Sequence, residues 1–138
     1  MTVPQDFIHA SRDFERFLLD ARAELSLATT HQTYAAVFGV LVTFRARLTP
    51  EQALRFADAL PPLLAALFLR DWAIAPPKPF GERAALTREV QGVRADHNLA
   101  PDSVITDTAR ALRAHVDARA FEAALATLPE GAAVFWRV

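Results

Sequence analysis

The feature that most constrains this chain is an internal repeat of residues with helical spacing. Leu60-Pro61 recurs as Leu128-Pro129, 68 residues later. Towards the N-terminus the offset becomes 72, and it pairs Arg22-Ala23-Glu24 with Arg94-Ala95-Asp96. The difference of four residues is about one helical turn. We infer that the chain has two related halves and that the second half has lost a turn near Ala100-Pro101.

Apolar residues recur with helical spacing along nearly the whole chain, and no segment alternates as a strand would. The stripe on the first helix consists of Phe7, Phe14, Phe17, Leu18, Ala21 and Leu25. Thr29 with Gln32, and Thr49 with Gln52, have the spacing of capping boxes that start helices. These patterns predict an all-α fold, a single-domain helical bundle of about eight helices built from two related four-helix halves.

Three prolines and a glycine interrupt the helical spacing between Ala73 and Glu82. Proline removes a backbone donor and fixes φ, so we expect an extended connection here. The first helical repeat then covers about residues 3–72, the Pro-rich linker about 73–82 and the second repeat about 83–138. A chain of 138 residues fits one domain, so we expect the two repeats to share a core.

Several short segments follow one another in a distinctive order. They are Phe14, Arg45-Ala46-Arg47-Leu48, Pro50-Glu51-Gln52-Ala53, Leu60-Pro61, Phe68 to Trp72 and Pro76-Pro77-Lys78-Pro79. With these segments the chain, from about Phe14 to Val138, resembles a bacterial family known as domain of unknown function 2267 (DUF2267). The resemblance implies an all-helical domain and transfers no catalytic residues. The chain departs from the family pattern in its shorter second-half loop and in Leu86, where an aromatic residue is expected.

The composition excludes several classes of protein. Cysteine is absent, which excludes disulfides, thiolate metal sites and cysteine nucleophiles. The net charge of −1 gives no overall field that attracts nucleic acid or anionic membranes. The longest apolar runs, Ala35 to Phe44 and Leu63 to Leu69, are shorter than the ~20 residues that cross a bilayer. Because the N-terminus also lacks a signal-peptide pattern, we expect a cytoplasmic protein with no membrane span and no nucleic-acid partner.

No motif assembles a catalytic or cofactor site. The glycines and serines form no phosphate-binding loop, dinucleotide fingerprint or nucleophile elbow. His9 with Asp13, and Asp96 with His97, each supply only half of the ligands that a metal needs. The repeated acids Glu24 and Asp96 would act as an acid–base pair only if a pseudo-twofold axis brought them together. The sequence therefore favours a protein without cofactor, metal or enzymatic activity.

Two functions remain compatible with this sequence. The apolar excess of Ala35 to Phe44 and Leu63 to Leu69 favours a non-enzymatic helical protein-interaction or scaffold module, a homo-oligomer that associates through leftover apolar helix faces. The alternative is a carrier or sensor of a small apolar molecule, bound in a cleft between the two halves. The candidate cleft residues are Arg70, Asp71 and Trp72, because they lead into the linker where the chain crosses between the halves.

Overall fold

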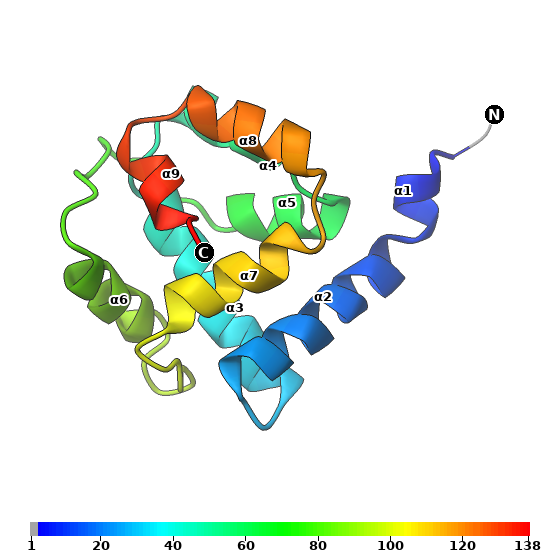
Figure 1. Ribbon diagram of the computed structural model, residues 1–138, viewed down its shortest axis with the longest axis horizontal. Helices are drawn as coiled ribbons and strands as arrows, with labels where there is room; N and C mark the ends of the chain where they lie inside the picture. The colour runs from blue at the N-terminus through cyan, green and yellow to red at the C-terminus, as the bar shows by residue number, and fades with distance from the viewer. Residues whose placement is uncertain (1–2) are drawn as a thin grey trace.

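The computed structural model describes residues 3–138, which form nine α-helices and no strand (Figure 1). This confirms the predicted all-α bundle. The helices are α1 (Gln5–Ile8), α2 (Ala10–Leu25), α3 (Thr30–Arg45), α4 (Pro50–Ala57), α5 (Pro62–Leu69), α6 (Arg83–Gly92), α7 (Val104–Arg113), α8 (Ala118–Ala126) and α9 (Gly131–Phe135). Over the described residues, no helix has both the length and the apolarity that crossing a bilayer requires.

Local sequence sets where several helices begin. The hydroxyl oxygens of Thr29 and Thr49 accept hydrogen bonds from the N–H groups of Gln32 and Gln52, at 3.1 and 3.2 Å. Each glutamine side chain in turn accepts from the N–H of its threonine, so both predicted capping boxes are confirmed. Asp117, which lies 68 residues after Thr49, caps α8 in the second half. The repeat therefore includes the helix-starting position itself.

Each half packs its first helix against the second helix of the other half. Helix α2 of the first half makes its most extensive contacts with α7 of the second, and α3 makes its most extensive contacts with α6 (Figure 1). The first helix of each half thus lies on the second helix of the other half. Because neither half covers its own first helix alone, buried apolar residues from both halves form one cluster.

The centre of this cluster is aromatic, and α3 runs through it. Phe44 lies 5.0 Å from Phe135, and the fully buried Trp136 lies 5.6 Å from Phe56, measured between ring centroids. From Ala35 to Phe44 every residue of α3 is buried except the half-buried Val42. A helix that is apolar on all sides belongs in an interior. The prediction that this segment leaves an apolar face for self-association is therefore wrong.

The stripe predicted for the first helix is internal only in part. Its residues from Phe17 onwards pack into the core, but Phe7 is 63% exposed, contrary to the prediction. The helix is interrupted at His9, and α1 lies beyond the rest of the bundle at the far end of α2 (Figure 1). Helix α1 buries no residue.

Candidate functional site

The three residues predicted to line a ligand cleft lie close in the chain but border two different grooves. Asp71 and Trp72 border a groove of about 300 Å³ between the C-terminal end of α3 and the linker residues up to Lys78. Arg70 borders another groove, where its Nη1 donates to the hydroxyl of Tyr34 at 3.2 Å. An ion pair of 3.5 Å joins Arg70 to Asp71.

Arg45 forms the inner wall of the groove at Trp72. Its guanidinium lies 5.5 Å from the centre of the Trp72 ring and donates to the carbonyls of Phe68 and Arg70, at 3.0 and 2.8 Å. Burial lowers the pKa of Arg45, and the nearby Asp71 carboxylate opposes this effect. Both bonds come from Nη1 and satisfy carbonyls at the end of α5, so they tie this arginine to the fold.

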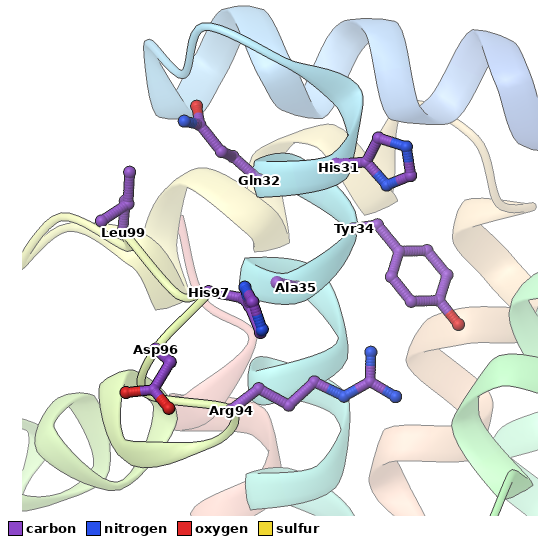
Figure 2. Close-up of a pocket in the computed structure, with 8 residues that line it drawn as sticks. All are labelled: His31, Gln32, Tyr34, Ala35, Arg94, Asp96, His97 and Leu99. Atoms are coloured by element: carbon purple, nitrogen blue, oxygen red, sulfur yellow. The ribbon is translucent and has the colours of Figure 1, made fainter.

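Another pocket, with a volume of about 490 Å³, lies at the other end of α3, against the loop that follows α6. It is lined by His31, Gln32, Tyr34, Ala35, Arg94, Asp96, His97 and Leu99. Figure 2 shows His97 in front of Ala35, while the side chains of His31 and Tyr34 extend to one side of α3. Arg94 extends to that same side and stacks over the Phe38 ring at 5.0 Å, whereas Asp96 points the other way (Figure 2).

The polar groups of this pocket do not form a catalytic set. His31 and His97 are exposed, and within residues 3–138 neither imidazole has a hydrogen-bond partner that would orient it as a general base. Glu24, the repeat partner of Asp96, forms an ion pair with Arg110 at 3.2 Å, so the two carboxylates have separate surroundings. In the part of the chain that the structure describes, no three His, Asp or Glu residues converge on a metal position.

Two smaller grooves occupy equivalent places in the two halves. The first-half groove, of about 230 Å³, is lined by Phe14, Leu63, Ala66 and Leu67 with Tyr34 and Arg70. The second-half groove, of about 320 Å³, is lined by Leu86, Gly131, Val134 and Phe135 with Phe80, Gly81, Arg83 and Glu130. Phe14 corresponds to Leu86 at an offset of 72 on the first helix of each half. The other three correspond at an offset of 68 on the last helix: Leu63 to Gly131, Ala66 to Val134 and Leu67 to Phe135. Each groove therefore lies between the first and last helices of its own half.

The second-half groove is mainly apolar and carries one cation, Arg83, and one acid, Glu130. Arg83 donates from Nη1 to the Phe135 carbonyl at 2.9 Å and from Nη2 to the Thr106 hydroxyl at 2.8 Å. Burial lowers the pKa of Arg83. Among the described residues no carboxylate forms an ion pair with it, although Glu130 lies on the same groove. A guanidinium without a counter-charge beside an apolar wall suits the carboxylate of a small apolar molecule.

Phe80, from the end of the linker, fills part of this second groove. Its ring lies so close to Gly131 that a Cβ atom there would stand 2.5 Å from the ring. Only glycine leaves enough room at this position. Sequence reasoning missed both grooves, although projecting the repeat offsets onto the first and last helices of each half would have marked their shared positions.

The chain also has a match among known families. Residues 14–135 match the family DUF2267, described as an uncharacterized conserved protein. The matched range begins within α2 and runs through α9, so that it includes both halves and leaves α1 outside. No curated protein matches the chain. Because the match covers most of the sequence, this protein belongs to the DUF2267 family.

Proposed function

We propose that this protein is a non-enzymatic helical interaction module that associates with a second copy of itself through apolar residues at its N-terminal end. The supporting observation is the exposure of Phe7 and Ile8, which are 63% and 61% accessible on a helix that buries nothing. Large apolar side chains gathered on a projecting element are typical of association surfaces.

The first-half groove offers a matching surface on the same molecule. Leu63 is 37% exposed there and Ala66 is exposed beside it. Asp6 is the acidic residue of α1, and Arg70 stands at the rim of the groove. Because one molecule carries both the exposed helix α1 and a groove that complements it, two copies can associate about a twofold axis.

Sedimentation equilibrium tests this proposal. The wild-type protein is expected to shift from monomer to dimer as its concentration rises. The double variant Phe7→Ser/Ile8→Ser should remain monomeric, because it removes the exposed apolar surface without touching the core. Leu54→Ser/Ile74→Ser is the matched control, since both residues are similarly exposed elsewhere, at 56% and 64%. A monomeric wild type, or an arm variant that still dimerises, would refute the proposal.

A second candidate function is a carrier or sensor of a small apolar molecule. The observation that favours it is the second-half groove, where Arg83 lacks a counter-charge beside the apolar Leu86 and Val134. The groove at Trp72 is rimmed by Arg45, Asp71 and Lys78, which suit an apolar ligand less well.

Calorimetric titration with octanoate tests this candidate. The wild-type protein should bind octanoate, and Val134→Asp, which places a carboxylate on the exposed wall of the groove, should abolish binding. Ala123→Asp, on the exposed face of α8, controls for the added charge. Trp72→Ala shows whether the groove at Trp72 contributes. Absence of octanoate binding together with absence of a copurifying ligand in native mass spectrometry would rule the candidate out.

A further inference from the structure

The residue that fills the second-half groove has a counterpart in the first half. Phe80 lies 72 residues after Ile8, the same offset that relates Leu86 to Phe14 on the first helices of the two halves. Ile8 precedes Phe14 by six residues, and Phe80 precedes Leu86 by the same number. In the second half this position is packed, because the Phe80 ring lies 6.3 Å from Phe135 and 6.0 Å from Phe44.

Two hydrogen bonds position the linker so that Phe80 reaches its groove. The N–H of Lys78 donates to the carbonyl of Ala46 at 2.9 Å, and Nε of Arg47 donates to the carbonyl of Pro79 at 3.2 Å. These bonds tie the linker to the end of α3 just before Phe80. The residues before α2 have no comparable contacts, since α1 buries nothing and Ile8 is 61% exposed.

The first-half groove, of about 230 Å³, has no side chain at the register that Phe80 holds in its counterpart, where about 320 Å³ remains open beside the ring. Leu63 stands in place of Gly131 and narrows the first-half groove. Isoleucine is smaller than phenylalanine, so Ile8 suits this narrower groove.

We name residues 4–9 the N-terminal arm. Charge opposes closure of the arm onto its own bundle, because Asp6 of the arm borders a groove of about 380 Å³ that is also lined by Asp13, Asp58 and Asp117. His115, which forms an ion pair with Asp20, also lines this groove. Like charges gathered in one groove repel one another. In Figure 1 the arm accordingly points away from the body of the bundle.

We propose that the N-terminal arm of one copy fills the first-half groove of a second copy, where Ile8 takes the place that Phe80 takes in the second-half groove. Asp6 of the arm then meets Arg70 at the rim. Each copy gives one arm and receives one, so the exchange closes as a symmetric dimer. This inference rests on the self-association proposed above and names the two surfaces that meet.

Engineered thiols test the exchange, since the chain has no cysteine of its own. Unlabelled Ile8→Cys protein is mixed with ¹⁵N-labelled Ala66→Cys protein and oxidised mildly. Both positions are exposed, so neither change disturbs the core. Mass spectrometry should find a disulfide between Cys-bearing peptides of different isotopic mass. Mixing with ¹⁵N-labelled Ala123→Cys, whose site lies on α8, gives the background yield.

A yield no higher than this background would overturn the exchange. A double variant, Ile8→Cys/Ala66→Cys, gives a second test, and a disulfide that forms only within one chain of it would overturn the exchange too. If the disulfide test fails but the wild-type protein dimerises in sedimentation, the proposed function stands while this inference fails. If the wild-type protein is monomeric, both fail. As a second readout, Ala66→Trp should fill the groove and abolish the dimer, whereas Ala123→Trp should leave it intact. Dimerisation of the Ala66→Trp variant would also overturn the inference.

Discussion

Arg45 and Arg113 occupy equivalent positions in the two halves and make the same contact. Arg45 donates to the carbonyl of Phe68 at 3.0 Å, and Arg113 donates to the carbonyl of Trp136, the equivalent residue, at 2.8 Å. These carbonyls lie at or just beyond the ends of the last helices, where intrahelical partners run out. Both halves thus use an arginine to satisfy the same backbone position.

The halves differ in a second pair of equivalent contacts, which join each half to the first helix of the other. Arg47 and its equivalent His115 each reach an acid on the first helix of the other half, Glu89 and Asp20 respectively. Arg47 is buried and bonds to Glu89 with both terminal nitrogens, whereas the Asp20 side chain is 58% exposed. The second link is therefore weaker, and it lies at the end of the molecule where the arm is unpacked. One end of the molecule is therefore tightly closed, whereas the other retains exposed apolar side chains.

The largest effect should come from removing the stronger link. Arg47→Met leaves Glu89 without its main partner and leaves the carbonyls of Thr43 and Pro79 short of a donor. We expect a loss of about 3 kcal/mol in the free energy of unfolding. His115→Met should cost less than about 1 kcal/mol, because it removes a single hydrogen bond to an Asp20 side chain that is 58% exposed. Urea denaturation of both variants checks this, and equal losses would contradict the asymmetry.

The next effect concerns the residues before each first helix. Phe80→Ala removes a half-buried ring from the second-half groove and should lower the free energy of unfolding by about 2 kcal/mol. Ile8→Ala should change it by less than about 0.5 kcal/mol, because an exposed side chain loses little on truncation. Thermal and urea unfolding at a concentration where the protein is monomeric measure both. A substantial loss for Ile8→Ala would mean that the arm packs within its own chain.

A smaller effect is expected from Gly131→Ala. The new Cβ would collide with the Phe80 ring, at a cost of about 1–2 kcal/mol. In the Phe80→Ala background the two ring contacts are gone and only the contact with the Cβ atom of residue 80, at 2.8 Å, remains, so the same change should cost less. A double-mutant cycle in urea measures this coupling. Additive effects of the two changes would show that Phe80 does not press on Gly131.

The smallest effect is a pH dependence at the tightly closed end. Burial raises the pKa of Glu89, but Arg47 and Lys78 together outweigh it and hold the pKa below its ordinary 4.5. A depressed pKa in the folded protein adds stability that is present above pH 4.5 and is lost as the pH falls through the folded value. Glu89→Gln should cost about 1 kcal/mol at pH 7, and the difference should shrink below pH 4.5. A difference that is constant from pH 7 to 3 would contradict this assignment.

Sequence reasoning succeeded where short-range chemistry decides the outcome. The capping boxes at Thr49 and Thr29 rest on side chains and N–H groups three residues apart, so they could be read directly. The prediction for Phe7 was wrong. Helical spacing shows which side chains share a face of a helix, but it does not show how far along the helix the rest of the bundle covers that face. Sequence reasoning also placed Arg70, Asp71 and Trp72 on one cleft, whereas the chain turns at Asp71, whose φ of 52° is left-handed, and Arg70 faces a different groove.

The sequence by itself determined the all-helical class, the family, the starts of α3 and α4 and the repeat, because each depends on residue order and local spacing. Only the tertiary structure decided that α2 lies on α7 and α3 on α6, that the apolar segment from Ala35 to Phe44 is interior and that Phe80 fills part of one of the two equivalent grooves. These outcomes depend on which apolar faces meet across the halves. Burial is a property of two surfaces together, and a periodic pattern describes only one of them.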